Sequence, residues 1–526
     1  MPRRLTDKKL ECKINQEPPP IMSYQSGLLK SAARLLLCWL WLVPTALFAD
    51  EAAASRHLEA ARTNETLLIA FLKDLPKGAD LHNHVTGAIY AESMLDAAVR
   101  SNLRFDPATG AFTTNPTNTV PAGALTNDTT LMRKFLDRAS MRGSYQDVSG
   151  HDLFFDAFAN FGPALGQLDY AQMLAEVVKR AKWQHIQYLE LMTAVAPADA
   201  LARAKSGLVI TNEDWEQALA TLKTRFPDLQ TAAKAWLDRL DQDVAVQAEE
   251  PPPITESSPT KIRYIYSLSR TGKSTTDFFA GIACGMAIMQ ADHRVVAINI
   301  VAPEDDYYAR QNFEVQMRMI DFLWQRLGRP NLTLHAGELT LECSPVEVMR
   351  SRIRKTIELG HARRIGHGVS IAWEDDLPGL LSNMRSQGIA VEICLTSNEG
   401  ILKVAGDRHP LALYRAAGVP FTLNTDDEGV NRSNLTMEFV KAVRTFNIRY
   451  PELKNIVRNS LEYSFLPGTS LYVDRDYQRV RPEFKRIRKE TWQPSDPAKS
   501  LLDQSEKLRE EVRLERALVE FEQQNQ

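Results

Sequence analysis

Short apolar runs alternate with longer amphipathic stretches over most of the chain. Amphipathic segments that read as helices, such as 314–328 and 345–360, separate many of these runs. Strands that alternate with helices at this spacing are typical of a parallel α/β fold. Eight runs qualify as strands, the number in a (β/α)8 TIM barrel. They are DLHNH (80–84), IQYLELM (186–192), IRYIYSL (262–268), VVAINIV (295–301), LTLHAGE (332–338), RRIGHG (363–368), IAVEICLTSN (389–398) and VPFTLNTDD (419–427).

The barrel pattern extends over 76–470 and has additions on both sides. An alanine-rich stretch with spaced leucines predicts an N-terminal helical extension at 50–75. Two inserts interrupt the early strands: 103–150, rich in Thr, Asn, Pro and Gly without clear core periodicity, and 205–260. The second insert begins as a helix and ends in AEEPPPITESSPT, which we expect to be a solvated linker or a loop tip. The charged tail at 471–526 ends in a segment that predicts a solvent-facing helix.

The N-terminal 49 residues contain one apolar run, LLLCWLWLVPTALFA, from Leu35 to Ala49. It is too short for a comfortable membrane span, and basic residues precede it. The pattern predicts a secretory signal peptide, with translation starting at Met22 as an alternative that gives a signal of normal length. We therefore expect a periplasmic or secreted protein without stable membrane insertion after signal removal. A retained N-terminal anchor is the alternative.

Composition narrows the choice of partners. The chain has 526 residues, 44% of them hydrophobic, and a net charge of −3, which is ordinary for a globular protein and does not indicate nucleic acid as a partner. Two of the five cysteines, Cys12 and Cys38, would leave with the signal. The remaining three have no paired spacing and form no CxxC, so a disulfide scaffold and a zinc site of that type are excluded.

Reactive residues gather where the predicted strands end. His82 and His84 are two positions apart, so on a strand both side chains point to the same face. In a barrel the C-terminal ends of the strands form the active-site face. Each residue alone fits an ordinary surface polar group, but together they indicate a site. The other members are His335 and Glu338, His367, and Asp426 and Asp427.

These residue types suit hydrolysis assisted by zinc. Three histidines (His82, His84 and His335) and Asp426 would bind one Zn²⁺, which lowers the pKa of a bound water toward about 7. Glu338 lies three residues beyond a ligand, and a protonated carboxyl there could donate to a ring nitrogen. His367 could orient or deprotonate the water. Asp427 would form a hydrogen bond to the substrate.

Five motifs, HNHVTGAI, HAGE, RIGHG, CLTSN and NTDD, resemble the adenosine deaminase family in this order. The likeness covers most of 76–467, and LPKGADLHNH and SLEYSFLPG (460–468) are similar to its secreted, growth-factor-related branch. The resemblance implies a (β/α)8 barrel with one zinc ion on the four ligands above. It implies that Glu338 protonates purine N1, that His367 assists the activated water, and that Asp427 accepts a hydrogen bond from N7. It also implies adenosine and 2′-deoxyadenosine as substrates, and a possible homodimer.

Two positions depart from the family pattern. Thr86 stands where many members have an aspartate that contacts the ribose 5′-hydroxyl. Ala302 stands where a glycine usually approaches the purine, and its methyl group could crowd a ligand. Another 6-aminopurine or an adenine nucleotide derivative is therefore an alternative substrate. A secreted nucleoside-binding or signalling protein is the alternative of another class. Cytidine-type chemistry is disfavoured, because the chain has no PCxxC to accompany an HxE.

Four further sequence features lie near the motifs, and most of them allow two interpretations. HDLFFDAFANFG (151–162) is either an aromatic lid or plain core. Arg270 supports the site or forms a salt bridge, and we favour the salt bridge. His361 and His409 are expected to be structural or to support the site from behind. Cys394 is not expected to be a nucleophile, because no base is paired with it.

Overall fold

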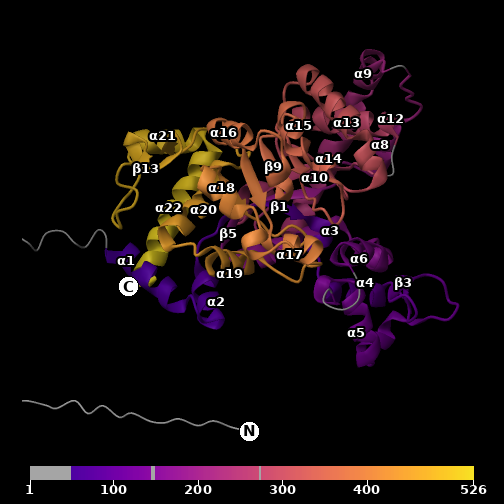
Figure 1. The fold of residues 1–526 in the computed structure, drawn as a ribbon, viewed down its shortest axis with the longest axis horizontal. Coiled ribbons are helices and arrows are strands. Elements are labelled where there is room, and N and C mark those ends of the chain that lie inside the picture. The colour runs from indigo at the N-terminus through magenta and orange to yellow at the C-terminus, as the bar shows by residue number, and fades with distance from the viewer. Residues whose placement is uncertain (1–48, 144–148, 212, 272–273, 526) are drawn as a thin grey trace, which may run out of the picture. The chain divides into compact units, whose positions relative to one another are not determined.

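Eight parallel strands form the centre of the computed structural model (Figure 1). They are arranged as two four-stranded sheets in the orders β1-β5-β6-β7 and β11-β10-β9-β8, and every neighbouring pair is parallel. Single bridges, Asn83 to Asp426 and Ile298 to Leu332, join the two sheets along both seams. The sheet therefore closes, and the predicted (β/α)8 barrel is confirmed. The strands are β1 (Gly78–His84), β5 (Ile186–Thr193), β6 (Lys261–Ser269), β7 (Val295–Val301), β8 (Thr333–Ala336), β9 (Arg364–His367), β10 (Ala390–Ile393) and β11 (Phe421–Leu423).

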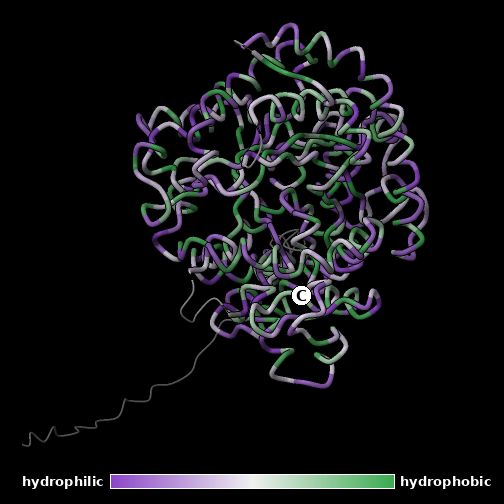
Figure 2. Tube along the Cα trace, turned by 90° about the vertical axis from the view of Figure 1, so that its right-hand side faces the viewer, coloured by the Kyte–Doolittle hydropathy of each residue, from purple (hydrophilic) through white to green (hydrophobic). Residues whose placement is uncertain are grey.

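The structure describes residues 49–525 apart from 144–148, 212 and 272–273, and Asp50–Gln526 form one unit. The predicted signal peptide lies outside the described residues, except for its last position. None of the described helices is both long and apolar enough to cross a membrane. The side chains of the barrel strands are almost all buried, and apolar segments gather in the interior (Figure 2). Burial on both faces explains why these strands read as continuous apolar runs.

Each predicted strand lies where the sequence places it, although the late ones are shorter. The run 389–398 is a strand only as far as Ile393, and the helix α17 (Leu395–Leu402) begins two residues later. The buried carboxylate of Glu438 accepts the backbone N–H groups of Leu395 and Thr396 at 2.7 and 3.2 Å. This acceptor at the helix N-terminus explains the early change from strand to helix.

Helices surround the barrel strands. The predicted helix at 314–328 falls largely within α13 (Tyr307–Arg326), whereas 345–360 is split into α14 (Val346–Met349) and α15 (Arg352–Glu358). The other helices that follow barrel strands are α3 (Val85–Ala88), α12 (Thr275–Ala291), α16 (Leu377–Gln387), α18 (Leu411–Ala417), α19 (Leu435–Phe446) and α20 (Tyr450–Glu462), with short 3-10 turns η4 (Val369–Trp373) and η5 (Gly406–Arg408).

The first insert has a small core of its own. Three short antiparallel strands form a sheet in the order β3-β2-β4, and Phe105, Phe112 and Phe135 are buried against one another. The aromatic residues are too far apart in sequence to produce a visible period, so the sequence did not predict this core. The elements between α3 and β5, within the insert and on both sides of it, are α4 (Ala91–Arg100), β2 (Arg104–Asp106), β3 (Ala111–Thr113), β4 (Val120–Pro121), η2 (Ala122–Thr126), α5 (Thr129–Arg138), η3 (Met141–Gly143), α6 (Gly150–Leu165) and α7 (Tyr170–Trp183).

The second insert is helical, and its end is not the solvated linker that we expected. Ile254 and Thr255 are buried in a short helix, and the Thr255 carbonyl accepts from the buried Arg263 guanidinium at 2.7 Å. A buried arginine requires acceptors, and this segment supplies one. The helices are α8 (Ala198–Lys205), α9 (Trp215–Lys223), α10 (Phe226–Ala248) and α11 (Ile254–Ser257).

The N-terminal extension is helical, as predicted, and packs against the C-terminal helix. Helix α1 (Ala49–Ala61) and helix α2 (Glu65–Asp74) replace the single expected stretch, and the Asn64 side chain caps α2. Phe71 of α2 contacts Tyr450 and Phe521, with ring centroids 6.3 and 5.1 Å apart.

The prediction of a solvent-facing tail helix was wrong. Helix α22 (Glu506–Gln524) buries an apolar stripe together with four glutamates. It crosses the N-terminal ends of β5 and β6, where Gln187 donates to the Glu510 carboxylate at 2.7 Å. Glu515 accepts from the buried Arg458 at 2.6 Å. Three of the four buried glutamates are therefore paired with cations: Glu506 with Arg263, Glu510 with Lys261 and Glu515 with Arg458. The tail also contains β12 (Tyr472–Val473), β13 (Asp476–Val480), η6 (Pro482–Phe484) and α21 (Asp496–Gln504).

Candidate active site

The four predicted metal ligands converge at the C-terminal end of the barrel. His82 and His84 end β1, His335 lies on β8, and Asp426 follows β11. One ligand atom of each lies within 4.8 Å of the other three. The Nε2 atom of His84 is 3.3 Å from His335 Nε2 and 3.3 Å from Asp426 Oδ1. The Nε2 atom of His82 is 3.5 Å from the same oxygen.

These separations fit a tetrahedral zinc site. Bonds of about 2.0–2.1 Å at tetrahedral angles place ligand atoms about 3.3–3.4 Å apart. Burial lowers the pKa of His84 to about 4 and that of His335 well below its usual value, so both rings are neutral at pH 7. Neutral imidazole is the form that binds a metal. His82 Nε2 is buried and has no hydrogen-bond partner among the described residues. The donor set therefore suits a divalent ion of the zinc type.

Two buried side chains orient the ligand histidines, and sequence reasoning missed both. Glu392 on β10 lies 2.6 Å from His82 Nδ1, and Asn299 on β7 lies 2.8 Å from His335 Nδ1. An acceptor on the far ring nitrogen fixes which nitrogen faces the metal. Burial opposes ionisation of Glu392, but the Arg364 guanidinium at 2.5 Å helps to lower its pKa to about 2. Each is a polar residue inside an apolar strand run, a signal that could have identified them.

The carboxyl of Glu338 lies at the same end of the barrel and is largely buried. Burial, reinforced by the nearby carboxylates of Asp426 and Glu304, raises its pKa well above the usual value. Its Oε1 atom lies 3.6 Å from His367 Nδ1. A carboxyl that keeps its proton at neutral pH can act as a proton donor. The structure therefore brings the predicted acid beside the predicted ligands.

Asp427 occupies space that only a glycine leaves open. A Cβ atom on Gly87 would lie 1.6 Å from Asp427 Oδ1, so the carboxyl rests directly over the Gly87 backbone. Burial and the adjacent Asp426 raise the pKa of Asp427 well above its usual value. Purine N7 carries no hydrogen, so the expectation that Asp427 accepts from N7 was wrong in direction. A protonated Asp427 can instead donate to such a nitrogen.

A cavity of about 240 Å³ opens beside these groups. Three phenylalanines of α6 (Phe154, Phe155 and Phe158) line it, so this helix both packs in the core and presents aromatic rings to the cavity. Thr86 and Ala302, the two residues expected to contact the substrate, line it as well. The remaining lining residues are His84, Val301, Pro303, His335, Glu338, His367, Ile401, Asp426 and Asp427.

Three of the site residues have left-handed backbone. The φ angles are 65° for His367, 59° for Asp426 and 82° for Ala302. Residues with a Cβ rarely adopt such angles, and each case costs of order 1–3 kcal/mol. Strain of this kind gathers at functional sites, where surrounding contacts hold it in place. The φ angle of Ala302 lies in the region that favours glycine.

A buried ion network holds the loop that carries Glu338. The Glu304 carboxylate accepts the backbone N–H of Glu338 at 2.9 Å and is paired with Arg270 and Arg352 at 3.4 and 3.1 Å. Arg270 also donates to the His335 carbonyl at 2.9 Å. The expected salt bridge of Arg270 is therefore present, and the same side chain also supports the site.

Three further residues named in the sequence, His409, His361 and Cys394, have no direct role in the site. His409 donates toward Asn398, which contacts His367, so it lies behind the site. His361 stacks on Trp324 with ring centroids 3.7 Å apart and pairs with Asp321, away from the ligands. Burial raises the pKa of the Cys394 thiol well above its usual value, which argues against a nucleophile, as expected.

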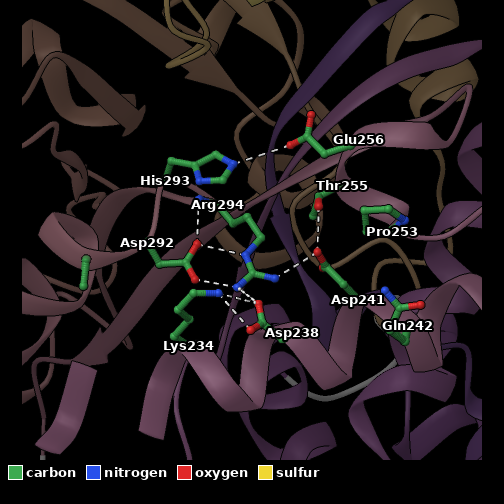
Figure 3. A pocket seen from close by; sticks show the side chains of 11 residues that line it. Lys234, Asp238, Asp241, Gln242, Pro253, Thr255, Glu256, Asp292, His293 and Arg294 are labelled. Carbon is green, nitrogen blue, oxygen red and sulfur yellow. Dashed lines mark hydrogen bonds and ion pairs between the residues drawn. The ribbon is translucent and has the colours of Figure 1, made fainter. Parts of the chain in front are cut away.

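A second cavity, of about 340 Å³, lies before the N-terminal end of β7, and charged side chains line it (Figure 3). Arg294 is paired there with Asp292, Asp238 and Asp241 at 2.5, 2.7 and 3.0 Å. Thr255 also donates to Asp241 at 2.7 Å. Since its central charges are paired with one another, this cluster holds α10 and α11 against the barrel.

A closed parallel barrel with three histidines and an aspartate at the C-terminal ends of its strands is the architecture of a metal-dependent hydrolase. The sequence model described as "Adenosine deaminase" matches residues 246–471. An adenosine deaminase of Clostridium perfringens is 32% identical over 174 residues, which are 32% of this chain and 47% of that enzyme. Over these residues the chain is similar to the adenosine deaminase family.

Two further similar proteins are named with purine compounds other than adenosine. An aminodeoxyfutalosine deaminase of Streptomyces coelicolor is 36% identical over 143 residues, which are 27% of this chain and 34% of that enzyme. The crystal structure of Arabidopsis ADAL complexed with IMP superposes with a TM-score of 0.50 at 19% identity, over 75% of this chain and 93% of that one. That likeness supports the fold. The chain matches about half, or less, of the length of these curated relatives.

Proposed function

We propose that the protein hydrolyses the 6-amino group of a purine nucleoside, with adenosine and 2′-deoxyadenosine as the first candidates. Water adds its oxygen to C6, the bond from C6 to the amino nitrogen breaks, and ammonia leaves, so that adenosine becomes inosine. The observation that carries the proposal is the convergence of the four-ligand cluster, a protonated Glu338 and Asp427 on one aromatic-walled cavity.

His82, His84, His335 and Asp426 would hold one zinc ion, and the bound ion would supply Lewis acidity that activates a water molecule. Glu338 holds a proton beside the cavity and would deliver it to purine N1, which makes C6 more electrophilic. Asp427 would donate to N7 and so fix the orientation of the ring. The phenylalanines of α6 would stack on the purine and exclude bulk water.

The lining of the cavity favours a nucleoside over a nucleotide. Among the described residues that line it, there is no lysine or arginine to pair with a phosphate. Thr86 offers a single hydroxyl where an aspartate would accept from the ribose. A second candidate is another 6-aminopurine compound, which Thr86 and the methyl group of Ala302 favour. The solved relative with IMP and the relative named for aminodeoxyfutalosine indicate the range of purines to test.

The direct experiment is ammonia release by the purified, zinc-loaded chain. Adenosine, 2′-deoxyadenosine, AMP, adenine and aminodeoxyfutalosine form the panel, and a chelator gives the metal control. We expect release from adenosine that the chelator abolishes. Faster release from another member would move the proposal to that substrate, whereas tight adenosine binding without any release would favour the binding-protein alternative.

The Glu338→Gln variant tests the proton donor. It keeps the shape and the metal ligands but removes the acidic proton, so we expect normal zinc content and a loss of turnover of about 100-fold or more. Glu342→Gln is the matched control, because Glu342 is on the same loop with a largely exposed side chain. Normal turnover in Glu338→Gln would contradict the assigned role.

Secretion or periplasmic location and a homodimer built by the N-terminal helices and the first insert stay predictions. Cell fractionation with N-terminal sequencing of the mature chain tests the first. Light scattering of the purified chain tests the second.

A further inference from the structure

A chain of hydrogen bonds runs from a backbone amide to His367. The Leu411 N–H lies 3.1 Å from His409 Nδ1, and His409 Nε2 lies 3.1 Å from Asn398 Oδ1. The Asn398 Nδ2 atom then lies 3.1 Å from His367 Nδ1. His409, Asn398 and His367 are 2%, 0% and 0% exposed, so water does not compete for these contacts.

The backbone amide fixes the direction of every bond in this chain. A peptide N–H can only donate, so His409 Nδ1 must accept and the proton of the neutral ring lies on Nε2. Burial, with the neighbouring His367, lowers the pKa of His409 to about 4, which keeps that ring neutral. His409 Nε2–H then donates to Asn398 Oδ1, and the Asn398 amide N–H donates to His367 Nδ1. The single proton of His367 therefore lies on Nε2.

One other group approaches the same nitrogen of His367. Glu338 Oε1 lies 3.6 Å from His367 Nδ1, beyond hydrogen-bond distance, whereas the Asn398 amide is within it. His367 Nε2 is buried and has no hydrogen-bond partner among the described residues. The ring packs beside the His82 and His335 rings, with centroids 4.9 and 5.0 Å apart. The protonated nitrogen is thus the one left for a molecule in the site.

We propose that His409 and Asn398 are positioning residues that hold His367 as the Nε2–H tautomer, so that His367 orients the attacking water by donating to it and does not deprotonate it. This inference rests on the proposed function for its chemistry. The sequence leaves two roles open for His367, which are orienting the water and deprotonating it, and this inference selects the first. In a neutral imidazole the nitrogen that carries the proton is a donor only and cannot accept a proton from water.

The first test measures the tautomer directly, without any substrate. The full, zinc-loaded chain is labelled with ring-¹⁵N histidine, and the His367 signals are identified by their loss in His367→Asn. We expect Nδ1 to give the shift of an unprotonated nitrogen and Nε2 that of a protonated one. The opposite assignment in the wild-type chain overturns the proposal.

The second test reverses the polarity of the chain. Asn398→Asp has nearly the same shape but only accepts at neutral pH, so His367 Nδ1 should gain a proton. We expect kcat to fall by about 10–100-fold while KM stays within about twofold, together with the changed ¹⁵N shifts. An Asn398→Asp variant that leaves both the shifts and kcat unchanged would refute the inference.

Conservative replacement separates a positioning role from a structural one. His409→Gln keeps an amide donor toward Asn398 and should retain most of the turnover, whereas His409→Leu should lose it. His361→Leu is the matched control, since His361 is a partly buried histidine stacked on Trp324 away from the site. Equal loss in His409→Gln and His409→Leu would overturn the proposal. If His409→Leu fails to fold, the ¹⁵N shifts of the wild-type chain and the kinetics of Asn398→Asp still test the proposal.

The outcomes distinguish this inference from the proposed function. An Nε2–H tautomer in a chain that releases ammonia from no purine would retain the hydrogen-bond chain and reject the reaction. Ammonia release from adenosine by a chain whose His367 is protonated on Nδ1 would retain the reaction and reject the hydrogen-bond chain.

Discussion

Ala302→Gly should stabilise the protein, although glycine usually destabilises. Ala302 follows β7 with φ = 82°, a conformation that costs a residue with a Cβ about 1–2 kcal/mol. Glycine removes this strain but gains about 0.5–1 kcal/mol of conformational freedom in the unfolded chain. The net effect is a stabilisation of roughly 0.5–1 kcal/mol.

Ala297→Gly is the matched control on the same strand. Ala297 is fully buried on β7 and is not among the residues with positive φ. The substitution removes a methyl group worth about 0.8 kcal/mol and adds the same unfolded-state freedom, so we expect a destabilisation of roughly 1.3–1.8 kcal/mol.

Thermal unfolding followed by circular dichroism compares the two variants. An unfolding entropy of about 2.1 cal/mol/K per residue gives about 1 kcal/mol/K for a chain of this size, so the two melting temperatures should differ by roughly 2–3 °C. Ala302 also lines the active-site cavity, so removal of its methyl group should lower the KM for a purine. Equal destabilisation by both variants would refute the reasoning from backbone strain.

For three further changes the structure predicts the direction of the effect on KM or on the free energy of unfolding. Gly87→Ala should displace the Asp427 carboxyl and raise KM for adenosine with zinc content unchanged, as measured by steady-state kinetics and metal analysis; an unchanged KM would remove Asp427 from the substrate contacts. Burial raises the pKa of Glu438 to about 7, so its contribution to stability is complete below about pH 4.5 and is lost as pH rises toward and through 7. The unfolding free energy should therefore fall between about pH 5 and 7, by up to about 1.4 kcal/mol per pH unit for this group, and Glu438→Gln should reduce that slope in urea titrations. Glu515→Ala leaves the Arg458 charge buried without its partner and should cost about 3–5 kcal/mol in the same assay, and a loss below about 1 kcal/mol would contradict a structural role for this pair.

The sequence predicts the barrel and the ligand cluster well for a physical reason. Each barrel strand is buried on both faces, so it appears as an apolar run, and each reactive residue follows such a run directly. The closure of parallel strands then brings those ends together without any further information. Glu392 and Asn299 were visible by the same logic, as polar residues within apolar strands.

The parts that were not predicted depend on partners far away in the chain. The glutamates of α22 indicate solvent until Arg263 and Arg458 are known to face them. The core of the first insert is formed by three phenylalanines that share no period. The hydrogen-bond chain behind His367 requires a helix, α17, where the sequence indicated a longer strand.

The bridge between Asn83 and Asp426 joins the first strand of the barrel to the segment after the last one. Two metal ligands come from one side of this seam and one from the other, because His82 and His84 end β1 and Asp426 follows β11. A zinc ion bound there would act as a cross-link that ties together the two ends of the whole barrel sequence. Loss of the ion would therefore weaken the contact between the first strand and the segment after the last strand. Amide hydrogen exchange should then rise first along β1 and β11.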